Sequence, residues 1–478
     1  MNVNLTSLWL KKMGSHRGAP RLWFDSDRVC SAGLIPGVRF DLVQLKNGIK
    51  LAPAAAGAYT VSSKLKHGKT VPVIDINSKE ALNGLSEEPV VRVIIRSDGV
   101  YVLPLASEVA KRERLTRLKT KLADGQPLLV ASLAHGGGVL AHAAHTGLAA
   151  AGIPATLAVC NEIDESYLEQ SLAHNPVASP RTVTLCAPMQ EVIQDEWLMQ
   201  QLPKVDVLEV GIPCSGHSNP GRSKRGLKLP EDHPEVGHLV HAALALIGKL
   251  QPASVVVENV PAYGEHASAS ILRSQLRDMG YQVTEHVLSA RDFGCLENRV
   301  RWALVATTDG IPTAPLQAIQ RDPLGAPERL GELLDEVPLD DESWRPLNYL
   351  KVKQDRDLAA GNGFAMQVVN PDSTQVPVIR RGYAKGGSTD PFIQHPQKPE
   401  LLRKFTPGEH ARIKGVPEEL IDGLSATTAH QMLGQGIAYA PFRQLFECLG
   451  IALRSLLHDG PCWTMSSSGA KRIEATIG

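Results

Sequence analysis

The stretch PLLVASLAHGGGVLAHAAHTGLAAAGIPATLAVC, residues 127–160, decides the fold. The apolar run PLLVASL ends in a glycine-rich turn, VLAHAAHTGLAAAG then predicts a helix, and ATLAVC predicts a second strand. A strand, a turn, a helix and a strand in this order predict a parallel βαβ unit. In such folds ligands bind at the carboxyl ends of the strands, which is where the glycine-rich turn lies.

The same alternation of strands and helices continues toward residue 310. Three further apolar runs predict strands: VDVLEVG at 205–211, SVVVENVP at 254–261 and RVRWALVAT at 299–307. Two segments predict helices: the amphipathic HPEVGHLVHAALALIGKL at 233–250 and ILRSQLRDMG at 271–280. We therefore expect residues 126–310 to form an α/β domain around a mostly parallel sheet.

The regions on either side of this domain follow other patterns. Residues 1–125 contain short strand-like runs from about 20 to 105, separated by Gly, Pro and Asn-Gly turns, and then a basic helix at 107–121. Residues 311–402 are rich in Gly, Pro and Asp and lose their periodicity, and helix signals return at 403–455. We expect a β-rich N-terminal domain and a smaller irregular region before the last helices.

Composition indicates a soluble globular protein of several domains. The chain has 478 residues, of which 43% are hydrophobic and 21% charged. No run approaches the roughly 18 apolar residues of a membrane-spanning helix, and no apolar segment follows the first lysines as in a secretory signal. Seven scattered cysteines without a CxxC pair predict neither a disulfide framework nor a zinc site. We expect a cytoplasmic protein without a metal or a membrane partner.

The charge pattern gives two opposing indications about nucleic acid. Lys plus Arg and Asp plus Glu number 50 each, and such a neutral chain is unusual for a nucleic-acid binder. Two segments are nevertheless basic: 111–121 holds six basic residues and one acid, and 216–229 holds four basic residues and no acid. Each segment fits either a solvated helix face or loop, or a surface that contacts phosphates.

Three short motifs place reactive side chains at strand ends of the predicted α/β domain. Cys214 follows the strand VDVLEV and precedes the basic loop, where positive surroundings favour the reactive thiolate; a small buried cysteine is the alternative. Glu258 ends the apolar strand SVVV, where partial burial would raise its pKa and suit it to general acid catalysis; a plain loop acid is the alternative. Arg299 and Arg301 alternate along a strand, so we expect only one of them to reach a ligand.

In this order the three motifs resemble the cytosine-5 DNA methyltransferase family: Pro213-Cys214, Glu258-Asn259-Val260 and Glu297-Asn298-Arg299-Val300-Arg301. Further motifs of the family resemble residues 132–138, 161–164, 403–417 and 433–436 of this chain. The resemblance implies a Rossmann-like methyltransferase sheet, dependent on S-adenosylmethionine, as the catalytic domain over 126–310. It also implies a target-recognition region over 311–402 and a segment, 403–478, that returns to the catalytic domain.

The resemblance implies a covalent mechanism on cytosine. Cys214 would attack carbon 6 of a cytosine that has flipped out of the double helix, so that carbon 5 can accept the methyl group. Glu258 would bind ring nitrogen 3 and the exocyclic amine, and Arg301 would hold the carbonyl oxygen. Arg299 belongs to the same motif as a structural or phosphate-facing arginine.

S-adenosylmethionine is the cofactor that the resemblance implies. The residues assigned to its site are Ala134, His135, Gly136, Gly138, Glu162, Ile163, Ala187, Pro213 and Gln435. Several positions depart from the family's pattern: Ser132 and Ala134 replace an acid and an aromatic residue, and Ala187 replaces the aspartate that contacts adenine. Glu297 stands for a usual glutamine, and Gln435 for a usual asparagine. These departures predict a weakened or altered donor site.

Double-stranded DNA is the implied substrate, and a cognate restriction endonuclease is a partner that the family suggests. The residues expected to contact DNA are Ser218, Arg222, Lys224, Arg225, Arg380, Arg381 and Lys385, from the basic loop and the target-recognition region. Residues 20–55 also resemble small swapped-hairpin DNA-binding barrels, so 1–125 is either a DNA-binding accessory domain or a plain interaction domain. The sequence does not indicate the oligomeric state.

Two other functions stay open. The same catalytic core could methylate cytosine in RNA, although the Cys-Phe-Thr signature of that branch is absent. The chain could also be a catalytically weak paralogue that regulates by binding DNA, which the alanines at 134 and 187 favour and the intact Cys214, Glu258 and Arg301 oppose.

Overall fold

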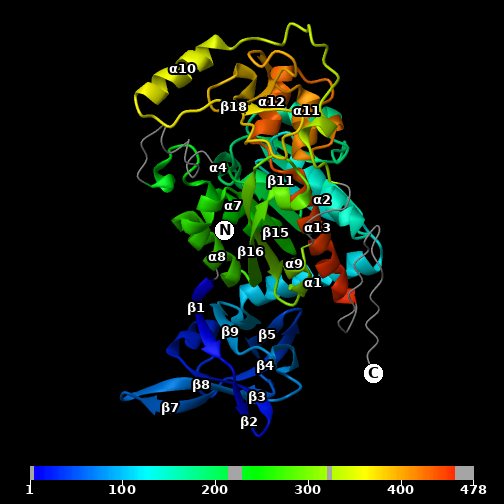
Figure 1. Ribbon diagram of the computed structural model, residues 1–478. Coiled ribbons are helices and arrows are strands. Elements are labelled where there is room, and N and C mark those ends of the chain that lie inside the picture. Colours follow the sequence, from blue (N-terminus) through cyan, green and yellow to red (C-terminus); the bar gives the residue numbers. More distant parts are fainter. Residues whose placement is uncertain (1–4, 214–228, 320–325, 458–478) are drawn as a thin grey trace. The chain divides into compact units, whose positions relative to one another are not determined.

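The structure, a computed structural model, describes residues 5–213, 229–319 and 326–457. The chain divides into two compact units, residues 1–113 and 114–478 (Figure 1). The boundary falls within helix α1, Ala106–Ala123, whose second half packs into the second unit through the buried Leu118.

The first unit is built from two antiparallel sheets, as the short strands of the sequence predicted. The six-stranded sheet has the order β1-β9-β10-β5-β4-β6, with strands Leu5–Lys12, Val90–Arg96, Gly99–Pro104, Gly48–Pro53, Arg39–Leu45 and Tyr59–Thr60. The four-stranded sheet has the order β2-β3-β8-β7, with strands Gly14–His16, Ala19–Asp25, Lys69–Asn77 and Ser62–Lys66. Apolar side chains from both sheets and from the 3-10 helix Asp27–Ala32 form one core.

A seven-stranded sheet organises the second unit, and it confirms the predicted α/β fold. Its order is β13-β12-β11-β14-β15-β17-β16, with strands Val183–Cys186, Ala155–Glu162, Leu128–Leu133, Val207–Gly211, Ser254–Asn259, Val300–Thr308 and Tyr281–Ser289. The first five strands are parallel, whereas β17 runs antiparallel to both β15 and β16. The sequence patterns did not predict β13 or β16, which are the two edge strands.

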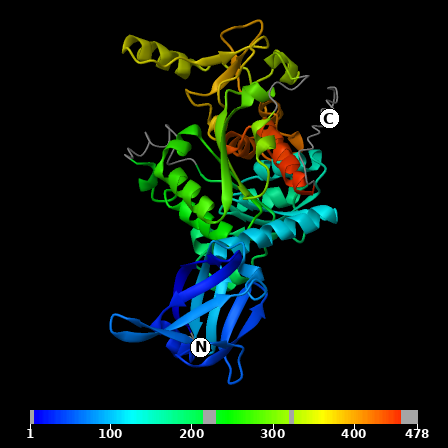
Figure 2. The ribbon, with the colours of Figure 1, turned by 90° about the horizontal axis from the view of Figure 1, so that it is seen from below.

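Helices cover both faces of this sheet (Figures 1 and 2). Val207 and Val256 point to the face covered by α2, Val139–Ala150, and α13, Tyr439–Arg454. Their strand neighbours Leu208 and Val255 point to the other face, which α7, Leu239–Leu250, and α8, Ala267–Asp278, cover. A sheet buried on both faces explains why its central strands read as continuous apolar runs. The smaller helices of this half are α3 Glu165–His174, α4 Met189–Val192 and α5 Glu196–Gln201.

The helix predicted over 233–250 begins only at Leu239. Residues 233–238 form turns instead, and a Cβ on Gly237 would lie 2.1 Å from the carbonyl oxygen of Glu231. Pro234 and the close approach at Gly237 therefore shorten the helix, although the apolar pattern extends further.

The basic helix α1 is confirmed, but neither reading of its charge holds for its second half. Arg114 is buried and donates to Thr308 Oγ1 (3.0 Å) and to the carbonyl oxygen of Met279 (2.8 Å). Arg117 and Lys121 form ion pairs with the buried Asp206 at 3.0 and 2.6 Å. These cations therefore hold α1 against the sheet rather than facing solvent or phosphates.

The region 311–402 is more ordered than its sequence suggested. It contains α9, Ala314–Gln317, and an unpredicted helix α10, Asn348–Ala359. A three-stranded sheet follows, formed by β18 Gln367–Val369, β19 Pro391–Gln394 and β20 Leu402–Arg403. The predicted return of helices is confirmed by α11 Pro407–Lys414, α12 Ala426–Gln435 and α13. Within the described ranges, no helix combines the length and the apolar character needed to cross a membrane.

Candidate active site

Glu258 and Arg301 form an ion pair at the carboxyl edge of the seven-stranded sheet. Arg301 Nε lies 2.7 Å from Glu258 Oε1, and each side chain is only 13% exposed. Burial raises the pKa of Glu258 even though Arg301 opposes the shift, which agrees with the direction expected for a general acid. The site thus holds a carboxyl group that can carry a proton beside a fixed guanidinium.

The chain that leads to Cys214 starts beside this pair. Gly211 is the register partner of Glu258, and a Cβ on Gly211 would lie 3.7 Å from Glu258 Oε2. Asn259 Nδ2 donates to the carbonyl oxygen of Ile212 at 2.9 Å, which ties the end of β15 to this chain. Pro213 is exposed, and it is the last described residue before the gap at 214–228. Cys214 itself, and the predicted DNA contacts Ser218, Arg222, Lys224 and Arg225, lie outside the described residues.

Three of the five cysteines that the structure describes differ from a reactive thiol. Burial raises the pKa of Cys160 and Cys295 to about 12 and that of Cys448 to about 11, so these thiols stay protonated at neutral pH. All five described cysteines are free. The described residues also contain no group of three or more His, Cys, Asp or Glu side chains that could hold a metal ion.

Arg299 is placed away from the edge, in a buried polar cluster. It donates to Glu297 at 2.8 and 3.1 Å and to the carbonyl oxygens of Ile379 (2.9 Å) and Gly434 (3.1 Å). Burial alone would raise the pKa of Glu297, but Arg299 and Lys414 outweigh it and keep this pKa below its usual value. Arg299 is therefore positioned as a structural residue, and of the two strand arginines only Arg301 reaches Glu258.

The glycine-rich turn after β11 packs closely against α12 and against the end of α3. Ala134 has the positive φ of 51°, which is rare for a residue with a side chain. A Cβ on Gly137 would lie 2.0 Å from Met432 Sδ, and one on Gly138 would lie 2.4 Å from Asn175 Nδ2. The position of a Cβ on Gly136 is 3.9 Å from Gln435 Nε2, an ordinary contact distance, so Gly136 is less crowded than the two glycines that follow it.

A buried chain of hydrogen bonds lies under this loop, and sequence reasoning did not find it. Glu209 of β14, the register partner of Ser132, hydrogen-bonds to that serine. Ser132 Oγ lies 2.7 Å from His135 Nδ1, and His135 Nε2 lies 2.7 Å from Ser171 Oγ. Burial raises the pKa of Glu209 to about 8 and lowers that of His135 to about 4, so both groups are neutral at pH 7. The ring of His135 is thus held by hydrogen bonds to Ser132 and Ser171, and a contact of this residue with the cofactor stays a prediction.

Glu162 ends β12 and is held by backbone amides. Its Oε2 accepts from Gly136 N at 2.6 Å, and its Oε1 accepts from the amides of Ile163 and Asp164 at 2.9 Å. Oε2 keeps a lone pair for a further donor, because a carboxylate oxygen can accept two hydrogen bonds. Ile163 is 67% exposed beside it, so it offers an apolar surface at the same edge.

Ala187 lies at the end of the neighbouring strand β13. Its carbonyl oxygen accepts from Asn161 Nδ2 at 2.7 Å, so a polar side chain of β12 orients this corner. The methyl side chain of Ala187 has no polar atom for a ligand. Position 187 therefore has no side-chain acceptor with which to bind a ligand.

The basic residues predicted in the target-recognition region differ in their surroundings. Arg380 pairs with the buried Asp390 at 3.1 Å, so it has a structural partner. Arg381 and Lys385 are exposed on either side of the buried Tyr383. Tyr383 donates to the carbonyl oxygen of Pro391 at 2.9 Å, which fixes the short turn that carries both cations.

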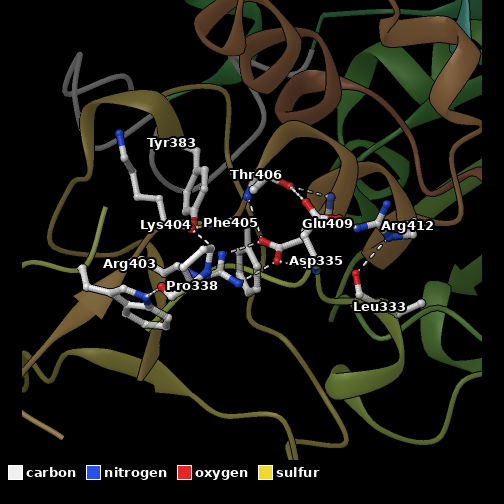
Figure 3. Close-up of polar contacts among 11 residues, drawn as sticks. Leu333, Asp335, Pro338, Tyr383, Arg403, Lys404, Phe405, Thr406, Glu409 and Arg412 are labelled. Atoms are coloured by element: carbon white, nitrogen blue, oxygen red, sulfur yellow. Dashed lines mark hydrogen bonds and ion pairs between the residues drawn. The ribbon is translucent and has the colours of Figure 1, made fainter. Parts of the chain in front are cut away.

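The segment 403–417 is locked to residues 330–338 by buried charge (Figure 3). Arg403 donates to both oxygens of Glu409 at 2.7 and 2.8 Å, and the amide of Asp335 donates to Glu409 Oε1 at 2.9 Å. Thr406 and Glu409 form a capping box at the start of α11. Arg412 bonds to Asp335 as well, so the chain around Asp335 is tied to α11 at two points.

Comparisons with known proteins identify a family for the larger part of the chain. Residues 144–449, well over half of the chain, match the family described as C-5 cytosine-specific DNA methylase. Type II methyltransferase M.NlaX of Neisseria lactamica is 28% identical over 263 residues, which cover 53% of this chain and 79% of that protein. Type II methyltransferase M1.ScrFI of Lactococcus lactis subsp. cremoris is 27% identical over 256 residues, which cover 52% of this chain and 63% of that protein.

A solved structure shows the same fold. The S. pombe Dnmt2 methyltransferase superposes with a TM-score of 0.53 over 68% of this chain and 98% of its own, at 19% identity. At this identity the likeness concerns the fold alone.

Proposed function

The chain belongs to the family of C-5 cytosine-specific DNA methylases, which are DNA cytosine methyltransferases, and we propose that it methylates carbon 5 of cytosine in duplex DNA through a covalent adduct with Cys214. The observation that carries this proposal is the buried Glu258–Arg301 pair, which lies beside the strand end that leads to Cys214. Type II methyltransferases among the relatives support a cognate restriction endonuclease as a partner.

Three residues, Cys214, Glu258 and Arg301, carry the separate steps of the proposed reaction. The thiolate of Cys214 forms a bond to carbon 6 of the ring, and the displaced electron pair makes carbon 5 nucleophilic. Burial raises the pKa of Glu258, which favours uptake of a proton that this residue can donate toward ring nitrogen 3. Arg301 bonds the carbonyl oxygen and stabilises the negative charge that develops there. After transfer, loss of the carbon-5 proton restores the ring's double bond and expels Cys214 as the thiolate.

The residues at the glycine-rich edge fit S-adenosylmethionine in part. When bound, this cofactor supplies an electrophilic methyl group. Gly136 has no side chain to hinder a ligand, Glu162 Oε2 can accept from a ribose hydroxyl, and Ile163 offers an apolar surface to the adenine ring. Ala187 offers no side-chain acceptor to the adenine amine. We therefore propose that the donor is the usual one and is bound more weakly than an acid at position 187 would allow.

The substrate base must leave the double helix to meet this geometry, because neither face of carbon 6 is accessible within the stack. Arg381 and Lys385 are exposed cations that support phosphate or groove contacts from the target-recognition region. Arg380 contributes less to such contacts, since Asp390 already neutralises it.

The decisive experiment measures methyl transfer from labelled S-adenosylmethionine to mixed-sequence duplex DNA. We expect the label in cytosine with the native chain and none with Cys214→Ala. Duplex DNA that contains 5-fluorocytosine should trap a covalent adduct with the native chain alone. Binding of DNA with neither transfer nor adduct would refute the proposal in favour of a DNA-binding regulator. Label that enters RNA instead of DNA would refute it in favour of an RNA cytosine methyltransferase.

A further inference from the structure

The two units carry opposite formal charge. Residues 1–113 hold 16 Lys and Arg against 10 Asp and Glu, which gives +6, whereas residues 114–478 hold 34 against 40, which gives −6. The neutral total of the chain conceals this division. The family match begins at residue 144, so it assigns no role to the basic unit.

Strand register places several of these cations on one face of the four-stranded sheet. Lys64 and Lys66 of β7 lie directly opposite Val71 and Lys69 of β8, and partners that face each other across a ladder share one side of the sheet. Residues of β8 with the same parity continue this face to β3. The charged and aromatic residues of the resulting basic face are Arg21, Trp23, Asp25, Lys64, Lys66, Lys69 and Asp75, together with Lys11, which lies over Trp23.

The acids on the basic face do not neutralise it. Asp25 accepts from Lys64 at 2.6 Å and from Lys66 at 2.9 Å, and these hydrogen bonds lower the pKa of Asp25 to about 2. Asp75 pairs with Arg21. Five cations against two carboxylates leave an excess of three positive charges on this face.

The ring of Trp23 keeps two of these cations in place. Lys11 and Lys64 lie 5.2 and 4.8 Å from its centroid, and cation–π attraction to the ring orients both ammonium groups. The face is therefore built as an ordered positive surface.

The strands β7 and β8 extend this face as a hairpin away from the rest of the unit (Figures 1 and 2). Its turn is formed by His67 and Gly68, both with positive φ, and Leu65 near the tip is 76% exposed. A two-stranded ribbon fits the major groove of duplex DNA. Lysines two residues apart on one strand are about 7 Å apart, and this spacing is about the rise of two nucleotides along one DNA strand.

We propose that the basic face and the β7–β8 hairpin bind the phosphate backbone of duplex DNA as a second site, separate from the one that flips the base. The contacts are those of lysine ammonium groups with phosphates, so they add affinity without sequence preference. The inference relies on the proposed function only in taking duplex DNA as the ligand. Such an anchor would compensate for the net negative charge of the unit that carries the catalytic residues.

The test uses the full chain and two double variants of equal charge change. Lys66→Ala with Lys69→Ala removes two cations from the basic face, and Lys46→Ala with Lys79→Ala removes two exposed lysines from elsewhere in the unit. Affinity for a mixed-sequence duplex is measured without methyl donor from 50 to 200 mM salt. We expect the hairpin variant to lower affinity about tenfold and to reduce the slope of log affinity against log salt by up to about 1.8. The control variant should bind like the native chain.

Two readouts separate this inference from the proposed function. Methyl transfer at saturating DNA should be the same in both double variants, because neither pair belongs to the unit that carries Glu258. A hairpin effect on binding in a chain that transfers no methyl group would support the second site alone. Equal affinity and salt slope in the two variants would overturn it, and so would a loss confined to duplex RNA.

Discussion

The buried acid Glu209 allows a quantitative prediction about stability. Replacing it by Gln keeps the shape of the side chain and a hydrogen bond to Ser132, but it removes the ionisable proton. Burial raises the pKa of Glu209 from 4.5 to about 8 in the folded chain. Between these values the folded state holds one more proton than the unfolded state, so stability is greatest below about pH 4.5 and falls until about pH 8.

The size of the effect follows from the shift. Each pKa unit corresponds to about 1.4 kcal/mol, so the native chain should lose up to about 1.4 kcal/mol per pH unit relative to Glu209→Gln across this window. The full window gives an upper limit of roughly 4 to 5 kcal/mol. Repulsion from Glu258 contributes to the same shift, and it acts in the same direction.

Urea unfolding followed by circular dichroism at pH 5, 6, 7 and 8 measures this difference. The unfolding free energy of Glu209→Gln minus that of the native chain should rise steadily with pH, because only the native chain must then bury a carboxylate. The exposed Glu196 changed to Gln serves as the control and should give a flat difference. A flat difference for Glu209→Gln as well would show that this acid is not held protonated, and the reasoning would be refuted.

Three further changes test the packing around the site. Glu297→Gln leaves the buried Arg299 without its carboxylate partner and should cost about 3 to 5 kcal/mol; adding Lys414→Met removes the amine that opposes Arg299 and should recover part of this in a double-mutant unfolding cycle. Gly138→Ala forces a side chain into a φ of 75° and against Asn175, so calorimetric titration should show at least tenfold weaker donor binding; unchanged affinity would contradict the close packing of the loop. Glu409→Ala removes the partner of a buried arginine (Figure 3) and should lower the free energy of unfolding by about 3 to 5 kcal/mol, which thermal unfolding can measure.

The sequence predicted the central sheet because its strands are buried on both faces and therefore read as apolar runs. The sequence did not predict the two edge strands of this sheet, because an edge strand is partly exposed to solvent. In β16, for example, Gln282, Thr284 and Glu285 are mixed with apolar residues. Helix α10 was not predicted for a similar reason. Leu350 is its one fully buried residue, so its apolar residues do not recur with the period of a helix. Both elements are stabilised by contacts with residues in other elements of the chain, which a local sequence pattern does not predict.

Some residues of the candidate site could be predicted from the sequence and others could not. Glu258 and Arg301 could be found from short motifs, because each motif lies at a strand end and the fold brings strand ends together. Lys414 and Ser171 could not, since the partners of each lie many residues away along the chain. Predicting them requires the packing of α11 and α3 against the sheet, which sequence periodicity does not contain.

Ser132 shows that the effect of a departure from a family pattern depends on its neighbours across the sheet. At this strand end an acid is usual, and its replacement by serine predicted a weaker donor site. The register of the sheet, however, sets Ser132 directly beside Glu209 of the next strand, whose carboxyl group hydrogen-bonds to the serine. An acidic group therefore remains at this point of the sheet, but it enters from β14 and is held neutral by burial.

The neutral Glu209 can donate to Ser132, and Ser132 can donate to His135 Nδ1. The single ring proton of His135 is then on Nε2, where it is donated to Ser171. Ionisation of Glu209 would reverse the order of donors along this chain and shift the proton of His135 to its other nitrogen. The substitution thus exchanges a fixed charge at the loop for a chain of neutral groups, and the proposed weakening of donor binding rests on Ala187.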